Sequence, residues 1–120
     1  MKVAITSQGP DINSAIDLRF GRAKYFIVVD TETGHSAAHD NTQNLNAVQG
    51  AGIQAGRNVI DLGVEAVITG NVGPKAFATL QAGGVKMYVG AGGTVGGALE
   101  KFKAGELECV GKANVEGHWM

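Results

Sequence analysis

The chain has 120 residues, of which 44% are hydrophobic and 19 are glycine, and its formal net charge is −1 at pH 7. This length fits one domain of ordinary size, and the glycine content is well above the usual ~7%. The charge argues against a general nucleic-acid or membrane-surface protein, and no apolar stretch approaches the ~20 residues of a transmembrane helix. A single cysteine, Cys109, cannot form an internal disulfide, so we expect a cytoplasmic protein.

The first half of the chain predicts three strands. Apolar runs at 2–6 and 25–30 are typical of buried strands. The turn at 31–34 leads into 35–41, whose weak apolar character predicts an edge strand in a hairpin with its predecessor. Residues 7–24 predict a long loop with room for one helical turn, and such loops in small domains are usually functional or mobile.

The second half predicts three amphipathic helices, which alternate with strands at 64–69 and 85–89. Glycines that follow the helices are the expected C-caps, whereas Pro74 suits a first helical turn and Thr94 suits an N-cap. The capping glycines are Gly63, Gly83 with Gly84, and Gly105. The inner faces of the helices are Val48, Ala51, Ala55, Val59 and Leu62; Ala76, Phe77 and Leu80; and Val95, Ala98, Leu99 and Phe102.

The predicted order of elements is therefore β-β-β-α-β-α-β-α. Strands that alternate with helices imply parallel neighbours with right-handed crossovers, and the first hairpin adds antiparallel strands. The sequence thus predicts an α/β domain over 1–107, with one mixed sheet of about five strands and helices on both faces. A C-terminal tail over 108–120 has no clear period, and Trp119 in it is expected to be exposed.

Three short loops, at 6–10, 70–74 and 90–94, follow predicted core strands. Ligands of open α/β sheets bind outside the carboxyl ends of the strands. Glycine lets backbone N–H groups turn inward and a helix start leaves N–H groups unpaired, and both features favour an anion. The alternative is that these glycines bind no ligand, because short turns between strands and helices are commonly rich in glycine. The candidate residues are Ser7, Gly70, Asn71, Gly73, Lys75, Gly90, Gly92, Gly93 and Thr94.

A basic segment at 19–24 lies in the long loop and adds three cations. We expect it to form an electropositive lid over the same strand ends, with Phe20 or Val72 as an apolar wall. A solvated basic patch is the alternative. The candidate residues of this segment are Arg19, Phe20, Gly21, Arg22 and Lys24.

Other motifs are weak. No GxxxxGK[ST] is present, and "GAGIQA" at 50–55 has the form G-x-G-x-x-A but follows polar residues rather than a strand. The histidines lack zinc-site spacing, so His39 is a weak metal candidate and a surface histidine is the favoured interpretation. Cys109 is predicted to be a buried small residue.

Four stretches together resemble the dinitrogenase iron-molybdenum cofactor biosynthesis family, which includes nitrogenase cofactor carriers. Within it, the chain is most similar to the molybdenum-copper orange protein branch of sulfate-reducing bacteria. The resemblance implies a ribonuclease-H-like fold and non-enzymatic binding of an anionic metal-sulfur cluster, of molybdenum-copper or iron-molybdenum type. The stretches, within 1–107, are "MKVAITSQG", "RFGRAKYFIVVD", "GAGIQAGRNVIDLGVEAVITGNVGPKAFATL" and "GVKMYVGAGGTVGGALEKFKAGEL".

Many members of that family have His-Phe-Gly where this chain has Arg19, Phe20 and Gly21. Arginine removes an imidazole ligand and adds a permanent cation with a fork of donors. A cluster bound here would therefore depend on charge and N–H donors, and it would need no cysteine because it carries its own sulfides. The implied partners are the cluster and proteins of a cluster-assembly or cell-division complex, with no nucleic acid and no membrane.

Two other functions stay open. Ribonuclease-H-like folds host nucleases and phosphoryl-transfer enzymes, whose sites gather several carboxylates around two metal ions. Here the first strand ends in Thr6 and Ser7, and no such cluster is visible. The third possibility is a regulatory protein that binds no ligand and docks on a partner through its edge strand or tail.

Overall fold

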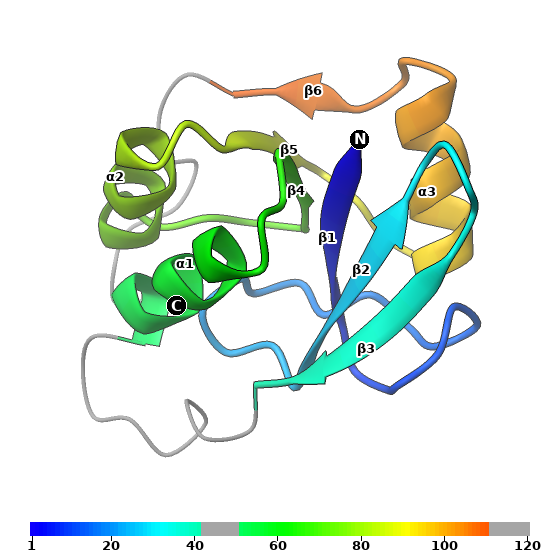
Figure 1. Cartoon of the computed structure of the whole chain (residues 1–120), viewed down its shortest axis with the longest axis horizontal. Coiled ribbons are helices and arrows are strands. Elements are labelled where there is room, and N and C mark those ends of the chain that lie inside the picture. Colours follow the sequence, from blue (N-terminus) through cyan, green and yellow to red (C-terminus); the bar gives the residue numbers. More distant parts are fainter. Residues whose placement is uncertain (42–50, 111–120) are drawn as a thin grey trace.

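The computed structural model describes residues 1–41 and 51–110, and it confirms the predicted order of strands and helices (Figure 1). One short strand, β6, follows the third helix and was not predicted. The elements are β1 (Lys2–Ser7), β2 (Tyr25–Asp30), β3 (Ser36–Asp40), α1 (Ala51–Asp61), β4 (Ala66–Ile68), α2 (Pro74–Ala82), β5 (Lys86–Val89), α3 (Val95–Lys103) and β6 (Glu108–Cys109).

The strands form one mixed sheet in the order β3-β2-β1-β4-β5-β6. β1, β4 and β5 are parallel, whereas β2, β3 and β6 pair antiparallel with their neighbours. The predicted α/β class and the edge position of β3 are confirmed. The ribonuclease-H-like assignment and the boundary between a domain at 1–107 and a tail stay predictions, although β6 extends the sheet to Cys109.

Helices cover both faces of the sheet, as predicted (Figure 1). Because successive side chains of a strand point to opposite faces, the sheet contributes to two apolar clusters. On one face Ala4 and Val67 pack with residues of α1 and α2 such as Val59 and Leu80. The opposite face packs against α3, and its cluster includes Val3, Ile5, Ile68, Val95, Ala98 and Leu99.

The helix ends follow the predicted signals. Pro74 is the first residue of α2, and the Thr94 Oγ1 accepts the Gly97 N–H at 3.1 Å as the N-cap of α3. Left-handed glycines follow all three helices, at Gly63, Gly84 and Gly105, with φ of 75–76°. The predicted inner-face residue Val48 lies outside the described residues. In residues 1–41 and 51–110, no helix combines the length and apolar character needed to span a bilayer.

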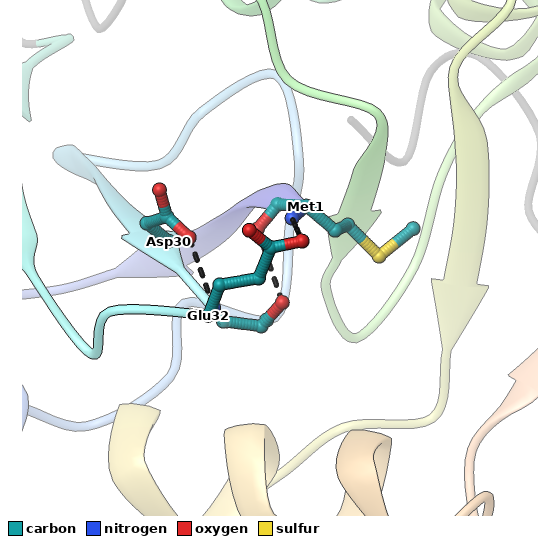
Figure 2. Close-up of polar contacts among 4 residues, drawn as sticks. Met1, Asp30 and Glu32 are labelled. Atoms are coloured by element: carbon teal, nitrogen blue, oxygen red, sulfur yellow. Dashed lines mark hydrogen bonds and ion pairs between the residues drawn. The ribbon is translucent and has the colours of Figure 1, made fainter.

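The chain start is tied to the turn after β2 (Figure 2). The Thr31 hydroxyl donates to the Met1 carbonyl at 3.1 Å, and the Met1 ammonium lies 3.7 Å from the Glu32 carboxylate. The Asp30 carboxylate accepts the Glu32 N–H at 2.9 Å. This hydrogen bond is the main reason why the pKa of Asp30 lies below its ordinary value of 3.8.

Candidate functional site

The carboxyl ends of β1, β4 and β5 meet at one edge of the sheet, which confirms that the three glycine-containing loops are neighbours. The buried hydroxyls of Thr6 and Thr69 are hydrogen-bonded to each other at 2.9 Å, joining the ends of β1 and β4. The Gly90 N–H donates to the Gly70 carbonyl at 3.0 Å, joining the ends of β4 and β5. We call the loops at 6–10, 70–74 and 90–94 together the carboxyl rim.

Residues 12–20, the crossing segment, run across the carboxyl rim. The prediction of one helical turn within 7–24 is wrong. The backbone of the crossing segment forms hydrogen bonds with the rim loops rather than within a helical turn. Three isolated β-bridges result, between Ser7 and Ile16, Ala15 and Thr94, and Arg19 and Asn71. The bonds include Ile16 N–H to Gly93 O (2.8 Å), Asp17 N–H to Thr6 O (3.1 Å) and Phe20 N–H to Asn71 O (3.2 Å).

At the α3 end of the rim, the crossing segment occupies the start of the helix. The Val95 N–H donates to the Ser14 carbonyl at 2.9 Å, and the Gly96 N–H donates to the Ile12 carbonyl at 2.8 Å. The next N–H, of Gly97, is taken by the Thr94 cap. The helix start therefore has no donors left for a ligand, but the loop before it does. Among the described residues, no acceptor faces the N–H groups of Gly92, Gly93 and Thr94.

At the α2 end, no side chain among the described residues caps the helix start. Its N-cap is Gly73, which has no side chain to accept a hydrogen bond. The first helical bond runs from the Phe77 N–H to the Gly73 carbonyl at 2.9 Å. In the described part of the chain, the N–H groups of Lys75 and Ala76 have no acceptor, and the Lys75 side chain is exposed. A helix N-terminus in this state favours an anion.

The crossing segment fixes Arg19 beside the α2 end. Arg19 forms a parallel bridge with Asn71, whose Nδ2 donates to the Leu18 carbonyl at 3.1 Å. The Asp17 carboxylate accepts the Arg19 N–H at 3.1 Å, so the backbone is held while the guanidinium stays exposed. Gly70 permits this approach, since a Cβ there would lie 2.8 Å from the Leu18 carbonyl oxygen.

Phe20 and Val72 do not form the expected apolar wall. Both side chains are 0% exposed and belong to the core cluster under α1 and α2, where Phe20 lies 5.4 Å from Phe26 between ring centroids. A large ring in the crossing segment packs inward because the core offers it apolar neighbours. The apolar side chain that faces outward next to Arg19 is Leu18, which is 51% exposed. Sequence reasoning missed both Leu18 and the anchoring role of Asp17.

The basic segment at 19–24 packs against the start of α1, which in turn contacts the start of α2. A Cβ at Gly21 would lie 2.9 Å from the Gly52 backbone in α1, and one at Gly52 would lie 3.1 Å from the Ala76 Cβ in α2. Arg19 and Lys24 are exposed, whereas Arg22 is half-buried and engaged within the chain. The structure therefore places the basic segment against α1, and its first residue, Arg19, beside the loop that leads into α2.

The remaining predicted residues lie apart from the α2 end or have structural roles. Ser7 is fully buried, and its hydroxyl donates to the Gly9 carbonyl at 2.6 Å. His39 lies on β3, level with the carboxyl end of β1 but two strands away from it, and is half-buried. Among the described residues, no group of three or more His, Cys, Asp or Glu side chains could hold a metal ion.

Cys109 is exposed, so its predicted burial is wrong, because β6 is an edge strand.

Comparison with known proteins agrees with the resemblance seen in the sequence. The apo form of the orange protein from Desulfovibrio gigas is 37% identical, with 95% of this chain and 96% of that one covered and a TM-score of 0.93. A putative NifB protein from Thermotoga is 42% identical, with 97% and 98% covered and a TM-score of 0.84. An uncharacterized protein from Methanocaldococcus jannaschii is 28% identical over 90% of each chain. Residues 1–105 match the family model described as dinitrogenase iron-molybdenum cofactor, and the chain therefore belongs to this family.

Proposed function

We propose that this protein is a non-enzymatic carrier of an anionic metal-sulfur cluster, of molybdenum-copper or iron-molybdenum type. The observation that carries the proposal is the exposed pair Arg19 and Lys75 beside the uncapped start of α2. The family description and the likeness to the orange protein support the same kind of cargo. Both the identity of the cluster and its mode of binding belong to the proposal.

The binding forces follow from the chemistry of such a cargo. A cluster that carries its own sulfides needs positive potential, N–H donors and an apolar contact rather than thiolate ligands. Arg19 and Lys75 supply charge, the N–H groups of Lys75 and Ala76 supply donors, and the exposed Leu18 supplies apolar surface. Hydrogen bonds to charged groups contribute about 1.5–3 kcal/mol each, so a few of them suffice for micromolar binding.

The other predicted residues take supporting places in this proposal. Lys24 and Arg22 add positive potential from the same segment, and the N–H groups of Gly92 and Gly93, which meet no acceptor among the described residues, face the cargo from the α3 side. Gly70, Asn71 and Gly73 shape the loop that meets Arg19. Ser7, Phe20, Gly21, Gly90 and Thr94 hold the surrounding backbone and core in place.

Anaerobic reconstitution tests the proposal. The full chain is incubated with tetrathiomolybdate and a copper(I) salt, separated from free metal by gel filtration, and analysed for metal content and visible absorption. We expect molybdenum and copper to co-elute with the protein in a constant ratio and to give it a visible charge-transfer spectrum. Elution of the protein without metal under these conditions, and with iron-containing sulfide clusters as well, would contradict a carrier function.

The two alternatives have weaker support. A nuclease would need carboxylates at the ends of β1 and β4, where the structure has Thr6 and Thr69 hydrogen-bonded to each other. Magnesium-dependent cleavage of nucleic acid by the pure protein would favour this alternative. A regulatory protein without a ligand would bind its partner equally well with and without metal, and the partner proteins of the carrier likewise remain proposals.

A further inference from the structure

The two edges of the sheet differ in how far they are protected. β6 has only two residues, and a short edge strand is a poor template for another chain. β3 has five residues and carries no proline or lysine, and four of the five are exposed. In the described part of the chain, no strand lies along its outer side. β3 is therefore the edge at which a further strand could be added.

The hydrogen bonds of the hairpin show which backbone groups of β3 face outward. The Asp30 N–H donates to the His35 carbonyl at 2.9 Å, and the Asn41 N–H donates to the Lys24 carbonyl at 2.8 Å. The backbone groups of odd-numbered residues in 35–41 thus bond to β2. Those of the even-numbered residues between them point to the outer side of β3. It follows that the N–H and C=O groups of Ala38 point away from the sheet, as do those of Ser36.

A groove beside this edge has room for side chains of an added strand. It lies on the face of the sheet that carries Val28 and has a volume of about 550 Å³. Its walls include Val28 of β2, Ala37 and His39 of β3, and Leu62 after α1. Ala37 is exposed and small, so it leaves the groove open at the edge.

We propose that β3 docks a second copy of this chain, whose own β3 pairs with it antiparallel about a two-fold axis at Ala38. In this register the outward N–H and C=O groups of each Ala38 form hydrogen bonds with Ala38 of the other copy. Each Ser36 hydroxyl lies opposite the Asp40 carboxylate of the second copy, and each His39 lies opposite Ala37, beside the groove. The strand is thus complementary to itself, because no two like charges lie opposite each other.

This dimer is weak and does not depend on the carrier function. One strand pair with a filled groove buries less than the ~1,200 Å² of a standard stable interface. We therefore expect the dimer to be populated at high protein concentration only. Dimerisation is measured as an increase in molecular mass, and it can be measured with or without a metal cargo. A negative result for the dimer can therefore be distinguished from a negative result for the carrier function.

Sedimentation equilibrium of the full chain, from micromolar to millimolar concentration, tests the proposal. We expect the wild type to dimerise and Ala38→Pro to raise the dissociation constant at least about tenfold, since it removes one outward N–H donor from each copy. Proline is tolerated at an edge position whose N–H does not bond within the sheet. The matched control Ala38→Ser keeps the donor and should dimerise like the wild type.

Ala38→Lys provides a second disrupting variant, because it places two like charges at the two-fold axis. If Ala38→Pro does not fold, Ala38→Lys alone shows whether the dimer forms through β3. A wild type that stays monomeric at millimolar concentration would overturn the proposal. Dimerisation of the disrupting variants with the affinity of the wild type would also overturn it, because the contact would then lie elsewhere.

Discussion

The α2 and α3 ends of the carboxyl rim are built alike, since a glycine-containing loop leads from a parallel strand into a helix at each. At the α3 end, the Thr94 hydroxyl and the carbonyls of Ile12 and Ser14 occupy the first helical N–H groups. At the α2 end, Gly73 has no capping side chain, and Lys75 is exposed. The crossing segment thus occupies the start of α3, whereas no described residue occupies the start of α2.

The start of α3 therefore has a structural role, whereas the start of α2 is the candidate binding site. A helix N-terminus that is already capped gains little from an anion, whereas an open one gains from both its dipole and its unpaired donors. The segment that closes the α3 end also carries Arg19 to the α2 end. Variants that change one end at a time test this division of roles.

The largest expected effect on stability is at the contact between the crossing segment and the α2 loop. In Gly70→Ala, the new Cβ would lie 2.8 Å from the Leu18 carbonyl oxygen and 2.9 Å from the Leu18 Cα, and backbone atoms cannot easily move. We expect a loss of about 2 kcal/mol in the free energy of unfolding, measured by urea denaturation. Gly92→Ala is the matched control, because nothing lies within 4 Å of its Cβ position. Equal losses in the two variants would contradict the close contact.

Removal of the α3 cap should have a smaller effect. Thr94→Ala leaves the Gly97 N–H without its acceptor and should lower the free energy of unfolding by about 1 kcal/mol, whereas Thr94→Ser should restore most of it. Metal retained per folded molecule should not change, because the Thr94 hydroxyl is used in the helix cap and the first N–H groups of α3 are already hydrogen-bonded. A loss of cargo without a loss of stability would instead place the binding site at α3.

Asp30→Asn should have the smallest effect and should alter neither end of the rim. The folded-state pKa of Asp30 is lowered, mainly by the Glu32 N–H, so the carboxylate stabilises the fold above its unfolded pKa near 4. That stability is lost as the pH falls through the lower folded value. The wild type should be slightly more stable than the variant at neutral pH, and the two should converge in strong acid. A constant difference across urea denaturations at several pH values would contradict this assignment.

Local signals in the sequence predicted most of the fold. Helix periodicity, Pro74, Thr94 and the glycines after each helix act within a few residues, and all these ends are confirmed. The two-residue strand β6 was not predictable, because so short a run has no period of its own. Its exposed edge position also explains why the predicted burial of Cys109 is wrong.

The candidate site was predictable only in part. That parallel strand ends meet at one rim follows from topology, so the loops were found correctly. The environments of Phe20, Asp17 and Leu18 depend on contacts between the crossing segment and loops far away in sequence. No local pattern distinguishes a ring that turns into the core from one that faces a ligand, and for this reason Phe20 was assigned to the wrong surface.

A titration of tetrathiomolybdate with copper(I) into two double charge variants shows whether the cluster binds at the start of α2. Arg19→Ala with Lys75→Ala removes two cations at the open α2 start, and Lys101→Ala with Lys103→Ala removes two exposed cations from the last turn of α3. We expect the first double variant to bind the cluster about 100-fold more weakly than the wild type, and the second to bind it as tightly as the wild type does. Equal affinity in both double variants would contradict binding at this site.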